Sequence, residues 1–248
     1  MSLQIKQFSL FDSCPGLIHG FSKRQGGLSN APFKGLNLGL TTGDDVFTVR
    51  KNRSLFFKTL NIPADRLVFP QQVHGDRVRI VDQPGKIPNC DALITDTPDL
   101  FLTIQTADCF PVFLCDPVKR VVAIVHSGWR GTAQNIVGKT IDWMIRRFES
   151  IPGKLLAAIG AGIQQSCYQV DEQTAKQFAK VYLLPDGVGR FKLNIQGAII
   201  DQLLERGLPR EQIEYDPTCT HCNKNDYYSF RRDGTNSGRM MGVIGLLP

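Results

Sequence analysis

Several features of membrane, fibrous and disordered proteins are missing from this 248-residue sequence. No apolar run approaches the length that a bilayer requires, and the first residues contain neither a charged start before a long apolar stretch nor a cleavage site. Low-complexity segments, internal repeats and a linker are also absent. With 42% hydrophobic and 21% charged residues, the composition is that of a globular protein. We therefore expect a cytoplasmic protein without membrane contact, folded as a single domain over residues 1–248.

Histidine is scarce, with four residues, whereas cysteine occurs seven times. In the cytoplasm, cysteines are better explained as free thiols, metal ligands or nucleophiles than as a disulfide framework. The CTHC segment over 219–222 has no second pair and no βαβ context, so the sequence favours neither a redox motif nor a zinc ribbon there. Four further cysteines carry no motif and are interpreted as structural: Cys14, Cys90, Cys115 and Cys167.

Basic residues outnumber acidic ones, giving a formal charge of +6, but they are scattered. The densest clusters are two arginine pairs, at 146–147 and 231–232, which are too short for a nucleic-acid-binding arm. No platform of interleaved aromatic and basic residues is present. The charge therefore favours small anionic ligands such as phosphate, and we expect no nucleic-acid partner.

Apolar spacing predicts four helices, and short apolar runs bounded by Pro, Gly, Asp or Asn predict strands of a central sheet. The predicted helices cover residues 45–60, 132–148, 171–182 and 191–207. The predicted strands lie within 67–82, 91–96, 100–117, 120–128 and 155–163. Because helices and strands do not alternate regularly, the pattern indicates an α+β fold with mixed sheets rather than a doubly wound one.

Two histidines and one cysteine lie at the ends of predicted strands: His74 in QQVHGD, Cys109 in TADCFP and His126 in IVHSGWRG. Zinc accepts this set, and a catalytic zinc keeps three protein ligands with a fourth position open. The three residues are far apart in the sequence, so spacing alone does not unite them. Alternatively, the histidines cap strands and Cys109 is a small buried apolar residue.

Polar residues beside these candidates suit a bound water and an anion: Gln72, Asp108 and Arg130. Since neighbouring side chains of an extended segment face opposite ways, Asp108 is interpreted as an orienting group or general base, or as a strand-end residue bonded to a loop. Arg130, between two glycines and just before a predicted helix, suits an anion pocket. Its alternative is packing on Trp129.

The motifs together resemble the YfiH-like family, first described as laccase-domain polyphenol oxidases and now as zinc-dependent purine nucleoside phosphorylases. The matching segments include FSKRQGGLS, LNLGLTTGDD, QQVHGD, CDALIT, TADCFPVFLCDP, AIVHSGWRG, AIGAGIQQSCYQV and YSFRRDGTNSGRM. They cover nearly the whole chain. The order QVHG, ADC and HSGWRG is the most specific part of the resemblance.

The resemblance implies a layered α/β/β/α fold with helices outside two mixed sheets. It implies that His74, Cys109 and His126 hold one metal ion, zinc or alternatively copper. It also implies phosphorolysis of adenosine, inosine, guanosine and methylthioadenosine, and deamination of adenosine, so purine nucleosides and phosphate are the expected partners. The oligomeric state is not predicted.

We assign candidate catalytic roles to the three ligands and to Asp108, which suits acid–base work. The candidate substrate or phosphate contacts are Arg24, Asn37, Gln72 and Arg130. A Lewis-acid site suits attack at C6 of adenine, while arginines and glycine-rich loops suit phosphate. The sequence lacks the H-x-E and P-C-x-x-C signature of nucleobase deaminases, so deamination would need a differently built site.

Three rival functions remain. A multicopper oxidase needs many more histidines than the four present. A cysteine hydrolase or amidase would use Cys109 with His74 or His126 as base, and related bacterial proteins have been linked to editing of cell-wall precursors. That rival predicts a metal-independent covalent intermediate on Cys109. A non-catalytic binding module predicts metal binding without turnover.

Overall fold

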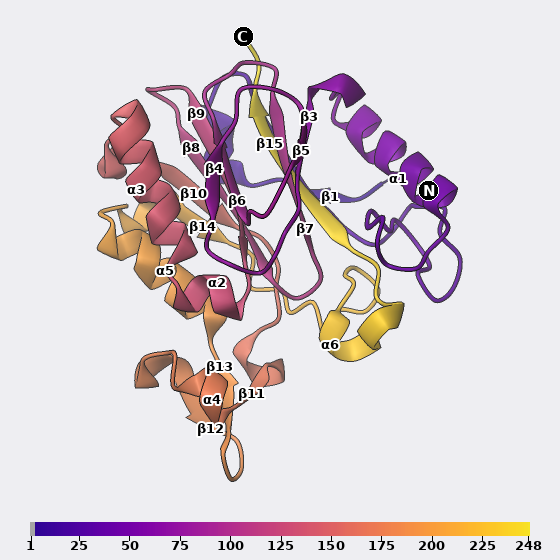
Figure 1. Cartoon of the computed structure of the whole chain (residues 1–248), viewed down its shortest axis with the longest axis vertical. Helices are drawn as coiled ribbons and strands as arrows, with labels where there is room; N and C mark the ends of the chain where they lie inside the picture. Colours follow the sequence, from indigo (N-terminus) through magenta and orange to yellow (C-terminus); the bar gives the residue numbers. More distant parts are fainter. Residues whose placement is uncertain (1–2) are drawn as a thin grey trace.

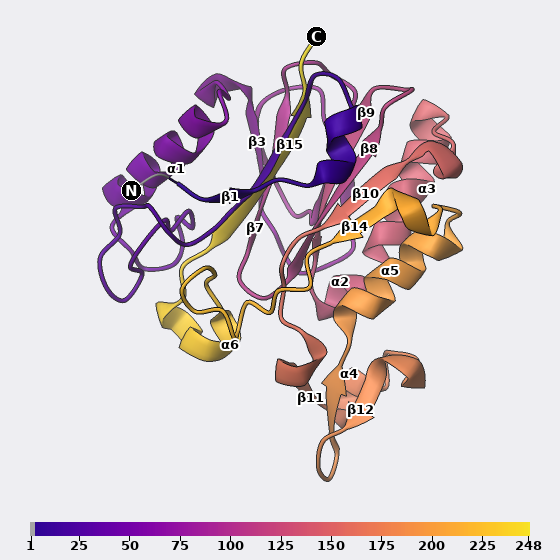
Figure 2. The same cartoon turned by 180° about the vertical axis from the view of Figure 1, so that it is seen from behind.

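Two six-stranded β-sheets lie face to face in the computed structural model, which describes residues 3–248 (Figure 1). Helix α1 (Val46–Thr59) covers the outer face of one sheet. Helices α3 (Ile136–Phe148) and α5 (Ile195–Glu205) cover the outer face of the other, as the opposite view also shows (Figure 2). The prediction of a layered α+β fold with mixed sheets is confirmed.

The first sheet contains strands from both the beginning and the end of the chain. Its strands, in spatial order, are β1 (Ile5–Lys6), β2 (Leu17–Ser22), β15 (Met240–Leu246), β7 (Phe101–Thr106), β3 (Leu67–Pro70) and β5 (Gly85–Ile87). Strand β15 pairs antiparallel with β2 and β7, whereas β3 runs parallel to β7 and β5. The sheet is therefore mixed.

The second sheet provides most of the strand ends at the candidate site. Its strands, in spatial order, are β14 (Ile213–Tyr215), β10 (Leu156–Ile159), β8 (Phe110–Asp116), β9 (Val121–Ser127), β6 (Ala92–Thr95) and β4 (Val78–Ile80). The four inner strands pair antiparallel, and the two edge strands pair parallel with their neighbours. Local apolar patterns predicted one central sheet, whereas the family resemblance implied the two mixed sheets that the structure shows.

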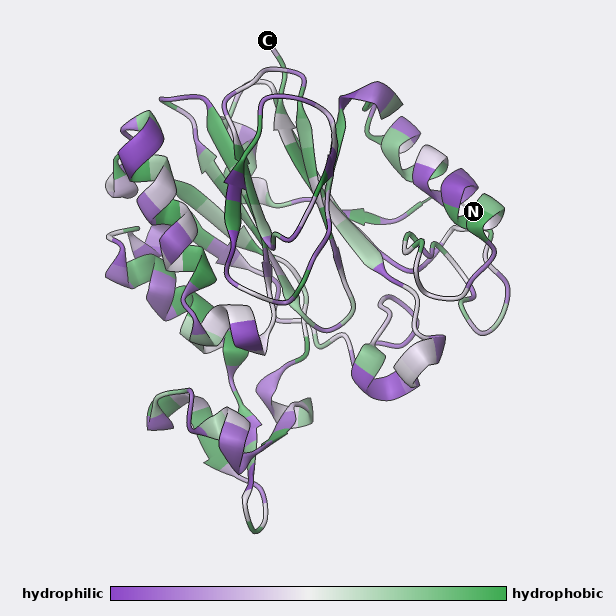
Figure 3. Cartoon of the chain, viewed as in Figure 1, coloured by the Kyte–Doolittle hydropathy of each residue, from purple (hydrophilic) through white to green (hydrophobic). Residues whose placement is uncertain are grey.

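Apolar side chains fill the space between the sheets, where Leu102 and Ile244 of the first sheet and Leu93, Phe113 and Ile124 of the second are fully buried. Figure 3 shows this pattern as hydrophobic strands inside and more polar outer helix surfaces. Over residues 3–248, no helix has the length and apolar character needed to span a bilayer.

The predicted helix over 132–148 is two helices, α2 (Trp129–Ala133) and α3, because Asn135 interrupts it. Asn135 adopts a left-handed backbone with φ 60°, and its side chain accepts a hydrogen bond from the Gly138 amide, which caps α3. The helical segment thus begins earlier than predicted. Arg130 lies inside α2, not before a helix.

The helix predicted over 171–182 is not continuous. It is divided into α4 (Glu172–Ala175) and the 3₁₀ turn η5 (Lys180–Tyr182). Phe178 and Tyr182 still pack against the core, so their apolar spacing reflects burial without a continuous helix. The surrounding strands form a small third sheet that projects from the molecule (Figure 1): β11 (Gln169–Asp171), β13 (Arg190–Leu193) and β12 (Leu183–Pro185).

The remaining helical elements are short. They are η1 (Ser9–Ser13), η2 (Ala64–Arg66), η3 (Pro152–Lys154), η4 (Gln165–Cys167), η6 (Arg210–Gln212), α6 (Phe230–Asp233) and η7 (Gly234–Asn236). Helix α5 also begins later than the predicted 191–207 helix, since its first residues form β13. It ends before Gly207, whose φ of +88° suits a helix terminator, as predicted.

Candidate metal centre

The structure brings His74, Cys109 and His126 together. His74 lies in the loop between β3 and β4, Cys109 in the bend between β7 and β8, and His126 on β9. One ligand atom from each lies within 4.8 Å of the others. The ligands of a single tetrahedral zinc stand roughly 3–4 Å apart, so a modest contraction would enclose an ion.

A buried carboxylate organises this cluster. Asp91 Oδ1 lies 2.8 Å from His126 Nδ1 and 3.0 Å from the His74 amide nitrogen, which donates to it. Its Oδ2 accepts hydrogen bonds from the amides of Val73 and Gly75, at 3.2 and 2.8 Å. With Nδ1 donating to Asp91, His126 keeps the lone pair of Nε2 free for a metal, the arrangement typical of metal-bound histidine.

The backbone around the ligands is shaped for close approach. His74 has φ 58° and Asp108, next to Cys109, has φ 90°, both uncommon for residues other than glycine. Gly128 leaves space beside the thiol, because a Cβ there would lie 2.8 Å from Cys109 Sγ. Such constraints collect at functional sites, and here they surround the ligands.

The charges of the metal-free cluster are coupled. Burial alone would raise the pKa of Cys109, but His126 and His74 outweigh it and lower this pKa to about 6. Burial alone would lower the pKa of His126, but the Cys109 thiolate and Asp91 outweigh it and raise this pKa to about 9. Near neutral pH, without a metal, Cys109 is therefore a thiolate beside a protonated His126.

Asp108 forms hydrogen bonds with segments other than those that carry this ion pair. Its Oδ1 accepts a hydrogen bond from Thr220 Oγ1 and its Oδ2 one from the Arg231 amide, both at 2.7 Å, and its backbone oxygen accepts from Ile163. Asp108 thus ties the Cys109 bend to three other segments. These contacts are compatible with both interpretations, an orienting residue and a strand-end residue bonded to a loop.

Positive side chains gather near the cluster. Arg130 is exposed and stacks on Trp129, with 4.3 Å from its guanidinium carbon to the ring centre. Burial lowers the pKa of Arg239, and the negative charges of Cys109 and Asp108 act against that lowering, which places Arg239 near both. The environment therefore suits an anionic ligand.

Tyr168 is an aromatic residue whose pKa is affected by the charges of Cys109 and the nearby arginines. Burial and the negative charge of Cys109 raise the pKa of its phenol, whereas Arg231 and Arg130 act to lower it. Arg231 also stacks on the Tyr168 ring at 4.9 Å. An aromatic face beside cationic groups is a surface on which a purine could stack.

Three predicted substrate contacts are engaged in hydrogen bonds within the protein. The Gln72 amide exchanges two 2.8 Å hydrogen bonds with the backbone of Gln105. Asn37 is fully buried, and its side-chain oxygen accepts from the Arg239 amide at 2.9 Å. Arg24 donates to the backbone of Lys34 and Lys224. Their contact with substrate stays a prediction, and the geometry of Asn37 indicates that it positions Arg239.

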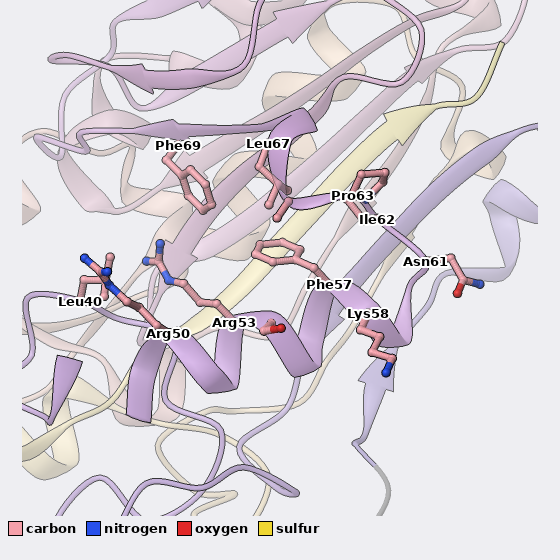
Figure 4. Close-up of a pocket in the computed structure, with 12 residues that line it drawn as sticks. Leu40, Arg50, Arg53, Phe57, Lys58, Asn61, Ile62, Pro63, Leu67 and Phe69 are labelled. Carbon is pink, nitrogen blue, oxygen red and sulfur yellow. The ribbon is translucent and has the colours of Figure 1, made fainter. Parts of the chain in front are cut away.

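Arg24 lines a hollow of about 1160 Å³ whose lining residues do not include the three ligands. Another hollow, of about 640 Å³, lies against α1 and β3 (Figure 4). Arg50, Arg53 and Lys58 line this second hollow, together with Phe57 and Phe69. Neither hollow is the metal cluster, so volume alone does not identify the site.

Sequence reasoning missed three features of the site. Asp91, in the CDALIT segment, was not assigned to the site, although its position opposite β9 makes it the partner of His126. Arg239 lies in the matching segment YSFRRDGTNSGRM but was given no role, and only the fold brings it near Cys109. Cys167 was interpreted as structural, yet it joins the two cysteines of the CTHC segment in a second cluster.

A family model described as multi-copper polyphenol oxidoreductase laccase matches residues 18–247. The chain belongs to this laccase family. A crystal structure of YfiH from Bacillus licheniformis is 33% identical, with a TM-score of 0.93 and coverage of 99% of this chain and 96% of that one. The resemblance to YfiH-like proteins is confirmed.

Two curated relatives of this laccase-family chain are named as nucleoside enzymes. A purine nucleoside phosphorylase of Deinococcus radiodurans is 37% identical over 231 residues, covering 92% of this chain and 88% of the relative. Adenosine deaminase RL5, from an unknown prokaryotic organism, is 29% identical, covering 96% of this chain and 97% of the relative. Neither name is that of a phenol oxidase.

Proposed function

We propose that this protein is a zinc-dependent purine nucleoside phosphorylase that also deaminates adenosine, built as one catalytic domain over residues 1–248. The substrates would be adenosine, inosine, guanosine and methylthioadenosine, with phosphate. One observation carries the proposal: two imidazoles and a thiolate meet within 4.8 Å in a chain whose relatives are named for these activities. The cationic surroundings of the cluster support it.

The donor set fits zinc better than a multicopper centre. Zinc binds imidazole nitrogen and thiolate sulfur and leaves a fourth position open in catalytic sites. A multicopper centre would need further histidines, but His19 lies in the core, where its Nε2 accepts the Phe8 amide at 2.8 Å. His221 is not part of the cluster either. Copper remains the second choice for the ion.

The residues of the chain would hold the ion and the reactants. His74, Cys109 and His126 would ligate zinc, which supplies Lewis-acid polarisation to a bound substrate. Asp91 would keep His126 in the tautomer that presents Nε2. Asp108 would hold the Cys109 bend in place through Thr220 and the Arg231 amide. We therefore propose a positioning role for Asp108.

Phosphorolysis needs an anion held against the ribose while the purine leaves. An oxygen of phosphate forms a bond to C1′, the bond from C1′ to N9 breaks, and its electron pair leaves with the purine. Two arginines are the proposed phosphate contacts: Arg239, and Arg130, whose guanidinium donates no hydrogen bond within residues 3–248. Tyr168 is the proposed stacking surface for the purine.

The test is a product analysis. Metal-quantified protein is incubated with adenosine, with and without phosphate, beside His126→Ala, and the products are separated by chromatography. The proposal expects adenine and ribose 1-phosphate only with phosphate, inosine without it, and loss of both in the variant. Unchanged adenosine despite one bound zinc would remove adenosine as a substrate, and inosine, guanosine and methylthioadenosine would then be tested in the same way.

The ion pair between Cys109 and His126 favours one second candidate. A thiolate with a pKa near 6 beside an imidazolium is also the nucleophile of a cysteine hydrolase or amidase, here one that edits cell-wall precursors. That enzyme would work without metal and form a thioester with its substrate. Mass spectrometry of metal-free protein with a peptide-like substrate would show an adduct on Cys109, and no adduct would form in the zinc enzyme.

A further inference from the structure

A second group of potential ligands lies outside the candidate metal centre. The sulfurs of Cys167, Cys219 and Cys222 lie within 4.8 Å of one another, although Cys167 is more than fifty residues from the other two. Cys167 ends the 3₁₀ turn η4, and Cys219 and Cys222 lie in the loop after β14. The sequence showed only the pair Cys219 and Cys222, and the fold adds Cys167 to form a cluster of three thiols.

The spacing of the sulfurs suits one ion. Two sulfurs bound to a tetrahedral zinc at about 2.3 Å stand about 3.8 Å apart. Cys167 Sγ lies 3.2 Å from Cys222 Sγ, and the third sulfur is within 4.8 Å of both. The 3.2 Å separation also exceeds the roughly 2.05 Å of a disulfide, so these are separate thiols. Displacements of about 1 Å or less would give each sulfur a zinc–sulfur bond.

The backbone around Cys219 is arranged for a thiolate. Its sulfur accepts a hydrogen bond from the Gln164 amide at 3.4 Å. Burial raises the pKa of Cys219, but this amide and those of Cys222 and His221 act to lower it. Amides two and three residues after a cysteine that point back to its sulfur stabilise the negative charge that a metal-bound thiolate carries. The CTHC turn therefore presents Cys219 and Cys222 on one side.

The loop that carries this pair is held firmly. The Arg232 guanidinium donates to the backbone oxygens of Thr220 and His221, both at 2.9 Å. Cys219 pairs with Gly162 in an isolated bridge, and Thr220 is bonded to Asp108. Ligands on a braced loop lose little entropy when they bind an ion.

We propose that Cys167, Cys219 and Cys222 form a second metal site that binds Zn²⁺ through three thiolates and leaves its fourth position to water. Soft thiolate ligands select zinc over magnesium or calcium, and binding releases the thiol protons. Since Thr220 lies between two of these ligands and bonds to Asp108, the ion would brace the loop that supports the Cys109 bend. This inference does not depend on the nucleoside reaction.

The site is tested by cobalt titration of full-length, reduced, metal-stripped protein under anaerobic conditions, with Zn²⁺ added afterwards as competitor. Thiolate-to-cobalt absorption in the near ultraviolet grows with the number of sulfur ligands, so it separates the two sites. The wild type is expected to bind two equivalents. Cys222→Ser and Cys167→Ser are each expected to bind one, with the near-ultraviolet absorption of a single thiolate.

His126→Ala is the matched control, because it alters the first centre and leaves the three thiols intact. It is expected to keep one equivalent with three-thiolate absorption. The proposal would be overturned if both cysteine variants bound two equivalents of cobalt. It would also be overturned if the wild type bound only one equivalent and His126→Ala bound none. The proposal would also fail if the wild-type protein were isolated with a disulfide between Cys167 and Cys222, seen as a mass lower by two hydrogens, and bound no second ion after reduction.

Discussion

The Asp91 carboxylate joins the loop of His74 to the strand of His126. Its Oδ1 lies 2.8 Å from His126 Nδ1 and accepts the His74 amide at 3.0 Å. Although burial raises the pKa of Asp91, the hydrogen bond and charge of His126 and the amides of Gly75 and Val73 lower it overall. One ionised side chain therefore sets the position of two metal ligands.

Replacing this carboxylate should weaken metal binding. In Asp91→Asn, an NH2 group replaces one of the two carboxylate oxygens and cannot accept the hydrogen bonds that this oxygen accepts. The tautomer of His126 is then no longer fixed. We expect zinc affinity to fall about 10–100-fold, measured by competition with a chromophoric chelator. Asp96→Asn is the matched control, since Asp96 lies in the same segment but is exposed. Equal affinity in both variants would show that Asp91 does not orient a ligand.

A single methyl group should close the space for the ion. Gly128 has φ −89° and ψ 176°, a backbone that alanine adopts freely, but its Cβ would lie 2.8 Å from Cys109 Sγ. We expect Gly128→Ala to lose most of the zinc bound by His74, Cys109 and His126. Gly153→Ala is the control, because a Cβ there meets nothing within 4 Å. Metal analysis after dialysis separates the two, and full occupancy in Gly128→Ala would show that the thiol tolerates the added methyl group.

Zinc affinity should increase with pH between about 6 and 9. In the metal-free protein, the raised pKa of His126, about 9, keeps this ligand protonated, while the lowered pKa of Cys109, about 6, leaves the thiolate free. Binding must then release one proton from His126, so the apparent affinity rises about tenfold per pH unit and levels off above 9. Calorimetry of Cys222→Ser, which removes the second cluster, in buffers of different ionisation enthalpy counts the protons released at this centre. No release at about pH 7.5 would refute the charge assignment.

Removal of Arg130 should affect phosphate more than nucleoside. A charge-assisted hydrogen bond contributes about 1.5–3 kcal/mol, so Arg130→Ala should raise the KM for phosphate by at least about tenfold. Arg210→Ala is the control, because Arg210 is also exposed and stacks on an aromatic ring, Tyr215, at 5.1 Å. Steady-state kinetics with each substrate varied in turn gives both constants. A rise confined to the nucleoside KM would assign Arg130 to the sugar or base.

Local patterns predicted the elements that depend on local chemistry. The α1 helix begins as expected because Asp45 caps it, and its apolar residues face the first sheet. The three candidate ligands were singled out because each ends or borders a strand, where side chains near glycines serve function more often than packing. The helix cap and the strand ends are both specified by residues close to them in the sequence.

Long-range pairing was not predictable from the same patterns. The antiparallel register that sets Pro111 opposite His126 brings the Cys109 bend beside Gly128, and no local signal specifies it. Cys167 has no neighbouring cysteine, so only the placement of η4 against the loop after β14 reveals its partners. The left-handed backbone of Asn135, which divides the predicted helix, is likewise one of several conformations that asparagine permits.

The most direct measurement is phosphate-dependent adenine release as a function of bound zinc. Protein is stripped of metal and zinc is restored in steps, with Cys109→Ser, which lacks the thiolate, measured beside it. The account predicts no turnover without metal, activity that returns in proportion to the zinc bound at His74, Cys109 and His126, and no recovery in the variant. Full turnover by the metal-free protein would contradict the central claim.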